Sequence, residues 1–273
     1  MPEYRGEDPQ FKLPDEAILA KTFNAEAAAY DGNRPGYPVS LFDGIVTETG
    51  LGRESTILEI GCGTGQATLP MAEKGYDITA VEPGEKLASI ARNKLRAYSK
   101  VKVINSSFEA AELPLEAFDL ALAAMSLHWV DETVRFRKVR DCLKSTGHLA
   151  ILYNYPLATA ESANFYEALA GVAQRYDFPE GAFQPIPEEE LGIRPEIDTK
   201  YFEQPDFYLQ KMKFRYGSGL RYAGHLATLS AVIALPESPR FKFLGDVAET
   251  IRQEFDDTLE LPFASTLALA RRK

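Results

Sequence analysis

Short apolar runs alternate with amphipathic stretches through the first half of this chain of 273 residues. The apolar runs predict strands at 56–60, 78–81, 101–105, 118–125 and 148–153. Apolar positions at helical spacing predict helices over 41–49, 66–74, 85–98 and 132–143. This alternation is typical of a parallel sheet covered on both faces, so we expect a doubly wound α/β fold.

The pattern changes twice in the second half. Residues 154–206 are rich in Pro and Glu and mix helical with irregular segments, which predicts an inserted, mainly helical lobe for the substrate. Beyond it we expect strands at 207–216 and 259–270 and helices at 220–234 and 240–255. We therefore predict three parts. Residues 1–153 form an N-terminal cap and the ligand-binding core, residues 154–206 form the lobe, and residues 207–273 complete a mostly parallel sheet of seven strands.

Composition and charge narrow the function classes. Hydrophobic residues make up 45% and charged residues 26%, as in folded globular proteins. The net charge of -10 argues against a nucleic-acid partner, which requires an excess of Lys and Arg. The sequence shows no signal peptide and no apolar run long enough for a membrane, so we expect a cytoplasmic protein. Cys62 and Cys142 lack a CxxC spacing, and we predict reduced thiols and no metal site.

The run from Glu59 to Gly65, E-I-G-C-G-T-G, lies between a predicted strand and a predicted helix. Glycine permits positive φ and close approach of a ligand to the backbone, and the following helix N-terminus offers unpaired N–H groups. A nicotinamide or flavin fingerprint would need a third glycine where Gln66 stands. The pattern is instead E-x-G-x-G-x-G.

This pattern resembles motif I of class I S-adenosylmethionine-dependent methyltransferases, of the type 11-like, small-molecule kind. The resemblance implies the Rossmann-like methyltransferase fold and S-adenosylmethionine as cofactor. It also implies that Glu59 helps to position the methionine end of the cofactor through its ammonium group or an ordered water. The other implied cofactor contacts of this loop are Gly61, Gly63, Thr64, Gly65 and Gln66.

Later loops extend the resemblance. Glu82 ends the second predicted strand, where an acid can accept hydrogen bonds from a ribose diol. Pro83 then turns the chain, and Leu87 is placed to pack on an adenine face. Implied adenine contacts after the third strand are Ser107, which replaces the usual Asp, with Phe108 and Glu109.

The segment after residue 118 resembles motif IV, with Ala124 and Met125 where the sulfonium end passes. His128 and Trp129 extend toward the substrate side, and His128 is the candidate general base. An N-terminal aromatic followed by Arg-Pro-x-Tyr-Pro resembles a family segment that folds over the cofactor. Its matching residues are Tyr30 and Arg34 for the cofactor and Tyr37 for the substrate.

The predicted activity is methyl transfer to a small-molecule acceptor, with O- or carboxyl-methylation favoured. No Asn-Pro-Pro-Tyr-type run, which serves methylation of exocyclic amines, follows the fourth strand. Two alternatives stay open: a nucleotide-dependent oxidoreductase, which Gln66 disfavours, and a non-catalytic module that binds the cofactor or a partner. The sequence indicates no oligomeric state.

Overall fold

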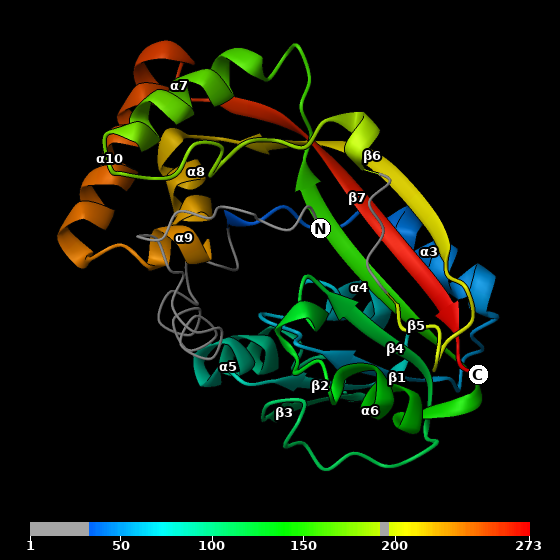
Figure 1. The fold of residues 1–273 in the computed structure, drawn as a ribbon. Coiled ribbons are helices and arrows are strands. Elements are labelled where there is room, and N and C mark those ends of the chain that lie inside the picture. The colour runs from blue at the N-terminus through cyan, green and yellow to red at the C-terminus, as the bar shows by residue number, and fades with distance from the viewer. Residues whose placement is uncertain (1–32, 192–196) are drawn as a thin grey trace. The chain divides into compact units, whose positions relative to one another are not determined.

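The computed structural model describes residues 33–191 and 197–273, which contain one sheet of seven strands (Figure 1). The strands stand in the order β3-β2-β1-β4-β5-β7-β6. Their bounds are β1 Thr56–Ile60, β2 Asp77–Glu82, β3 Val101–Asn105, β4 Phe118–Ala124, β5 Leu143–Pro156, β6 Asp206–Tyr216 and β7 Leu259–Arg271. The predicted α/β fold with a seven-stranded sheet is confirmed.

The first five strands form the parallel part of the sheet. β1 pairs in parallel with β2 and β4, β2 with β3, and β4 with β5. Ile57, Leu58 and Ile60 of β1 are buried, as expected of a strand covered on both faces. The strand order reverses between β1 and β4, and ligands of doubly wound sheets bind beyond the carboxyl ends of the strands at such a point.

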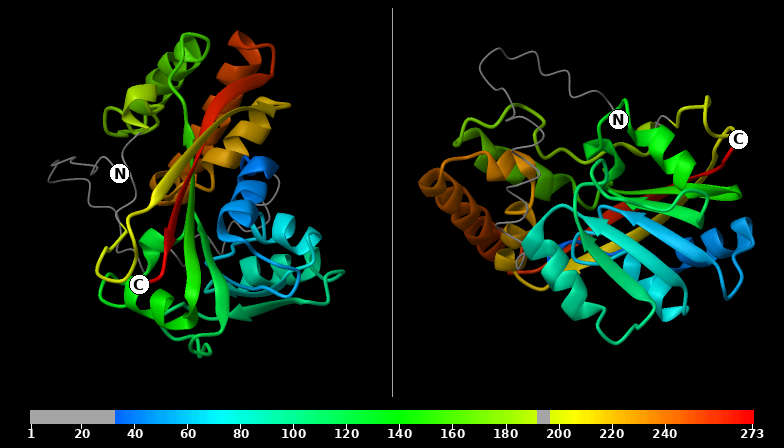
Figure 2. Two further views of the ribbon diagram at one scale, coloured as in Figure 1. Left: turned by 90° about the vertical axis from the view of Figure 1, so that its right-hand side faces the viewer. Right: turned by 90° about the horizontal axis from the view of Figure 1, so that it is seen from below.

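The last three strands in the chain are long, and the sheet is mixed. β5, β6 and β7 contain 14, 11 and 13 residues, and β7 runs opposite to its neighbours β5 and β6 (Figures 1 and 2). The prediction of 148–153 for β5 was too short. The strand begins at Leu143, which pairs with Phe118 before a register shift, and exposed polar residues after Leu143 obscured that part of the strand.

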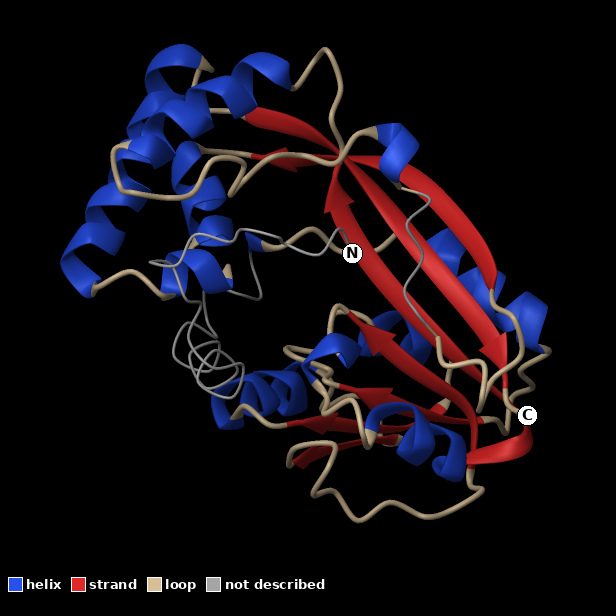
Figure 3. Ribbon diagram, viewed as in Figure 1, coloured by secondary structure: helices blue, strands red, loops and turns tan. Residues whose placement is uncertain are grey.

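Helices flank these strands (Figure 3). The helices of the described residues are α3 Val39–Thr49, α4 Thr68–Glu73, α5 Glu85–Lys94, α6 Arg135–Cys142, α7 Ala163–Gln174, α8 Gly219–Leu226, α9 Ser230–Ile233 and α10 Glu237–Glu254, with 3-10 turns η1 Leu127–Trp129 and η2 Glu188–Glu190. The predicted helix at 220–234 is two helices, because the chain turns at Thr228, whose hydroxyl donates to the His225 carbonyl. Within the described residues, no helix combines the length and apolar character needed to cross a membrane.

The chain divides into two compact units. The described part of unit 2 comprises residues 36–154, 197–210 and 265–273, and that of unit 1 comprises 33–35, 155–191 and 211–264. This grouping differs from the predicted division at 154–206 and 207–273. Residues 211–264 join 155–191 because α7, α8 and α10 share one apolar core that includes Phe165, Tyr216 and Phe243. The functional division remains a prediction.

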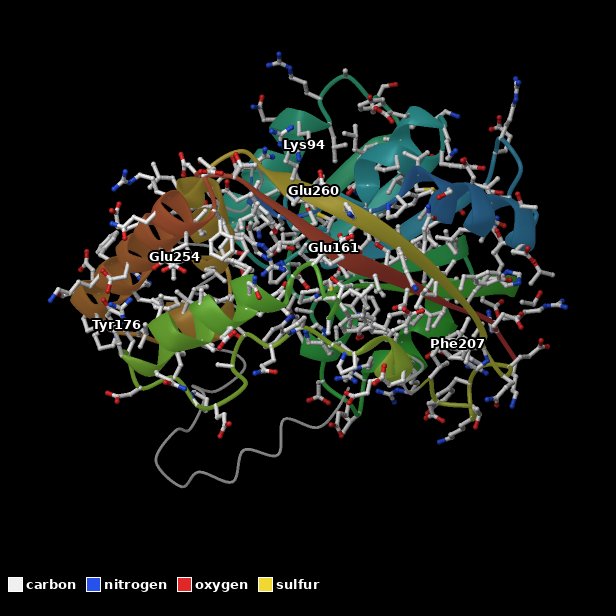
Figure 4. The ribbon with its side chains drawn as sticks, turned by 90° about the horizontal axis from the view of Figure 1, so that it is seen from above. Lys94, Glu161, Tyr176, Phe207, Glu254 and Glu260 are labelled. Carbon is white, nitrogen blue, oxygen red and sulfur yellow. The ribbon has the colours of Figure 1, made fainter. Side chains whose placement is uncertain are left out.

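Charged side chains protect the edge strand β6 in the part of it, from Lys211 onward, that belongs to unit 1. Lys213 of this strand lies 2.7 Å from the Glu161 carboxylate and 3.9 Å from that of Glu260, both labelled in Figure 4. A lysine held between carboxylates hinders another strand from pairing with the sheet edge.

Candidate functional site

The glycine loop connects β1 to α4 at the point where the strand order reverses. Gly61, Gly63 and Gly65 have φ of +67°, +56° and +83°, a region that favours glycine. The N–H groups of Gly61 and Cys62 both donate to the Val81 carbonyl, at 2.8 and 3.1 Å. These bonds fix the start of the loop to the end of β2. The predicted helix start at 66 was two residues early, since the turn continues through Ala67 and α4 begins at Thr68.

Gly61 also permits a close contact with the segment after β4. A Cβ at position 61 would lie 2.6 Å from the Ser126 Cβ, a distance that real Cβ atoms do not tolerate. The buried Ser126 hydroxyl donates to the carbonyl of Ile60, the last residue of β1. The ends of β1 and β4 are therefore joined directly beside the loop.

Glu82, the last residue of β2, holds two turns in place. Its Oε2 accepts a hydrogen bond from the Gly63 N–H and its Oε1 from the Gly84 N–H, each at 2.8 Å. Burial raises the pKa of this carboxyl group, and the two backbone donors oppose that shift. Each oxygen retains a second lone pair, so the predicted ribose contact is compatible with these bonds.

Glu59 lies directly below the loop, and its side chain is only 1% exposed. Its Oε2 and the buried hydroxyls of Thr64 and Thr68 have no hydrogen-bond partner among the described residues. Burial raises the pKa of Glu59 to about 8, a shift that the nearby Thr68 hydroxyl opposes and the Glu82 carboxylate increases. Buried polar atoms are rarely left unpaired unless a ligand or water meets them. These three oxygen atoms can accept hydrogen bonds from the ammonium group of S-adenosylmethionine, so they fit its positively charged end.

The two cysteines are free and buried. Burial, with the carboxylates of Glu59 and Glu82, raises the pKa of the Cys62 thiol, and burial raises the pKa of Cys142 to about 11. A thiol is nucleophilic only as the thiolate, so both are unreactive near neutral pH.

The predicted adenine contacts lie in a tightly braced turn after β3. The Ser107 hydroxyl accepts from the Ala110 N–H at 3.3 Å, and Glu109 Oε1 accepts from the Asp131 N–H at 3.0 Å. Phe108 is buried, with the Lys138 ammonium 5.2 Å from its ring centroid. Leu87 is buried on α5, whereas Pro83 is exposed. These five residues belong to unit 2 with the glycine loop, and their contacts with the cofactor remain predictions.

The chain after β4 contains a second special backbone position. Ala124 ends β4, and Met125 has a φ of +53°, which is uncommon for a residue other than glycine. The Met125 N–H donates to the Leu152 carbonyl at 2.9 Å, and its sulfur accepts from the Asn154 N–H at 3.4 Å. The predicted sulfonium-end residues are thus held from β5, a connection that the sequence did not reveal.

His128 and Trp129 lie on the η1 turn and form an aromatic group with Tyr153 of β5. The His128 ring centroid is 4.8 Å from that of Trp129 and 5.9 Å from that of Tyr153. The guanidinium of Arg135 donates to the carbonyls of His128 and Val130, which fixes the turn. Sequence reasoning missed Tyr153, although it ends a predicted strand at the ligand-binding edge of the sheet.

The N-terminal residues of the predicted site are divided. Arg34 belongs to unit 1, where its Nε donates to the Thr228 hydroxyl at 2.9 Å and its Nη2 to the Thr228 carbonyl at 3.0 Å. Tyr37 belongs to unit 2 and packs edge-on against Phe42. Tyr30 lies outside the described residues. Arg34 and Tyr37 therefore fall in different units, and the contacts of all three residues with cofactor and substrate stay predictions.

A search of residues 33–191 and 197–273 finds no group of three His, Cys, Asp or Glu side chains that could hold a metal ion.

Comparison with known proteins identifies a methyltransferase domain. Residues 58–151 match the family model described as a methyltransferase domain. CRG1 of Saccharomyces cerevisiae, a candidate S-adenosylmethionine-dependent methyltransferase, is 32% identical over 162 residues, which cover 58% of this chain and 53% of that protein. The chain thus spans about half the length of the curated relatives that it matches.

Solved structures agree on the fold. A candidate type II methyltransferase from Anaeromyxobacter dehalogenans superposes with a TM-score of 0.59 at 24% identity, covering 87% of this chain and 97% of the other. Haemonchus contortus phosphoethanolamine N-methyltransferase 2, solved with S-adenosylhomocysteine, gives 0.50 at 15% identity, covering 96% and 60%.

The fold and the matched segment define a class I S-adenosylmethionine-dependent methyltransferase domain. The segment that matches the family model, residues 58–151, contains the glycine loop, Glu59, Glu82 and His128. The predicted methyltransferase family is confirmed for this segment, and the activity and cofactor of the whole protein are proposals. Neither the family model nor the relatives described above supports the nucleotide-dependent oxidoreductase.

Proposed function

We propose that this protein transfers a methyl group from S-adenosylmethionine to a small-molecule acceptor, either at a hydroxyl oxygen or at a carboxylate oxygen. The observation that carries the proposal is the buried carboxyl group of Glu59 beside the glycine loop, whose Oε2 has no hydrogen-bond partner among the described residues. The acidic net charge of -10 and the lack of an Asn-Pro-Pro-Tyr-type run support the acceptor class.

The residues divide the work of such a reaction. The cofactor supplies an activated methyl group, so the protein mainly aligns the acceptor and excludes water. Glu59 meets the positively charged end of the cofactor, and Glu82 holds the loop through the Gly63 N–H while its remaining lone pairs accept from the ribose. His128, with Trp129 beside it, accepts the proton of a hydroxyl acceptor; a carboxylate acceptor needs no base.

Cofactor binding is the first test. We expect S-adenosylhomocysteine to bind the wild-type protein at micromolar or lower concentration in calorimetry. Gly63→Arg should abolish binding. Gly63 has a φ of +56°, which a residue with a side chain rarely adopts, and its N–H donates to Glu82, so the substitution should displace the loop. Gly52→Arg is the matched control, since nothing lies within 4 Å of its Cβ position. Undetectable binding by the wild-type protein would contradict the proposal.

Turnover is the second test. A screen of metabolites with methyl-labelled cofactor should yield a labelled product, and His128→Ala should then reduce its rate about 100-fold or more if a hydroxyl is the acceptor. Unchanged turnover would exclude His128 as an essential base. Cofactor binding without labelling of any compound would favour the non-catalytic module.

A further inference from the structure

We propose that Glu59 is uncharged in the free protein and releases its proton to solvent when the cofactor binds. This inference rests on the proposed function, because it assigns Glu59 to the positively charged end of the cofactor. It adds to that function a proton that leaves in the binding step.

Two buried carboxyl groups lie on neighbouring strands. Glu59 of β1 stands beside Ala80 of β2 in the register, and Glu82 ends β2. Their side chains are 1% and 5% exposed. Two carboxylates in one buried region do not both ionise readily, so the group with the weaker support for its charge retains a proton.

The hydrogen bonds decide which group that is. Glu82 accepts from two backbone N–H groups, at Gly63 and Gly84, and such donors stabilise the ionised form. Glu59 Oε2 has no hydrogen-bond partner among the described residues, and the nearby Thr68 hydroxyl, which forms no hydrogen bond with it, is the only group that opposes the rise of its pKa. Glu82 is therefore the ionised member and Glu59 the protonated one.

No described cation compensates a charge on Glu59. The groups that face it are the Glu82 carboxylate from β2, the Cys62 thiol from the loop and the Thr68 hydroxyl from α4. Arg92 of α5 lowers the pKa of Cys62, but it is not among the groups that shift the pKa of Glu59. Its Nε donates to the Val103 carbonyl instead. With burial as the largest cause, the pKa of Glu59 rises to about 8, so the group is mostly neutral at pH 7.

An incoming ammonium group reverses this balance. The O–H bond of the Glu59 carboxyl breaks, its proton goes to the buffer, and the carboxylate stays opposite the ammonium, which keeps its own protons. An opposite charge at short range favours the ionised carboxylate. By linkage, the affinity should rise about tenfold per pH unit below the pKa of the free carboxyl and level off above it.

Calorimetry with S-adenosylhomocysteine tests this step. Titrations at pH 7 in phosphate and in Tris, which differ in ionisation enthalpy, should report about one proton released per ligand bound. The dissociation constant should increase about tenfold between pH 7 and pH 6. Glu59→Gln, which cannot ionise, should release no proton and bind with little dependence on pH. Glu73→Gln, exposed at the end of α4, is the matched control and should behave as the wild type.

The outcomes separate the two proposals. Wild-type binding without proton release would overturn this inference and leave the proposed function intact. Proton release that persists in Glu59→Gln would also overturn it, by assigning the proton to another group. Absence of any binding would overturn both. The wild-type proton count is decisive even if Glu59→Gln folds poorly.

Discussion

Each compact unit contains a buried group of polar side chains, and the two groups are built in opposite ways. Below the glycine loop of unit 2, Glu59, Thr64 and Thr68 present oxygens without hydrogen-bond partners among the described residues. In unit 1, the Tyr216 hydroxyl bonds His225 Nδ1, and Thr228 accepts two bonds from Arg34. Among the described residues, the polar atoms below the glycine loop lack hydrogen-bond partners, whereas those around Thr228 and His225 have them.

The proposed cofactor site and the paired group of unit 1 differ in free energy for this reason. An unpaired buried polar group costs about 1–3 kcal/mol, whereas a paired one contributes about 1 kcal/mol of stability. The unpaired oxygens below the loop are consistent with a ligand that completes them. In unit 1, the pairing of Arg34 with Thr228 connects residues 194 positions apart and needs no ligand to satisfy it.

The pKa shifts of Glu59 and His225 also have opposite signs, so these residues change the stability of the fold in opposite ways as pH rises. The pKa of Glu59 is raised to about 8, so between pH 4.5 and 8 the folded state holds a proton that the unfolded state has lost, and stability falls as pH rises. Burial, with the Arg34 charge, lowers the pKa of His225 to about 3. Between pH 3 and 6.5 the unfolded state therefore binds the extra proton, and stability rises with pH.

The largest expected effect comes from filling the space beside Ser126. Gly61→Ala introduces a Cβ 2.6 Å from the Ser126 Cβ at a φ of +67°, and we expect it to lower the free energy of unfolding by about 3 kcal/mol and to abolish S-adenosylhomocysteine binding. Urea unfolding and calorimetry measure the two effects.

Gly50→Ala is the matched control for backbone strain. Its φ is +65°, but nothing lies within 4 Å of its Cβ position, so only the left-handed conformation is penalised, by about 1 kcal/mol. Equal losses in the two variants would show that the Ser126 contact does not matter for the loop.

The second effect is the pH dependence of stability. Glu59→Gln should remove a slope of at most about 1.4 kcal/mol per pH unit between pH 6.5 and 8, above the pH range in which His225 contributes. His225→Asn, which can still accept from Tyr216, should remove the opposite slope between pH 3 and 4.5. Urea unfolding across pH 3–8.5 measures both. Slopes of the same sign would refute the contrast between the two groups.

The smallest expected effect concerns Thr228. Thr228→Val removes the hydroxyl that accepts from Arg34 and donates to the His225 carbonyl, and should lower the free energy of unfolding by about 1–2 kcal/mol without changing S-adenosylhomocysteine affinity.

Arg34→Ala sharpens this result. If the guanidinium serves only unit 1, this variant should lower stability at least as much as Thr228→Val and alter affinity less than threefold. An affinity loss of tenfold or more in Arg34→Ala alone would instead support the cofactor contact that the sequence predicts.

The sequence determined the order of elements and the family, because both depend on local patterns. Alternating apolar runs predicted all seven strands, and the run from Glu59 to Gly65 with Glu82 predicted the cofactor class, since glycine spacing and an acid at a strand end are readable along the chain.

Only the tertiary structure decided how distant residues meet. Nothing in the sequence shows that Ser126 touches Gly61, that Arg34 bonds Thr228, or that 211–264 folds with 155–191. It likewise does not show that Glu59 Oε2 is buried without a hydrogen-bond partner among the described residues, while Glu82 accepts two backbone hydrogen bonds. The charge of a carboxyl group depends on its solvation and on the donors and charges around it, and those are brought together only by the folded chain.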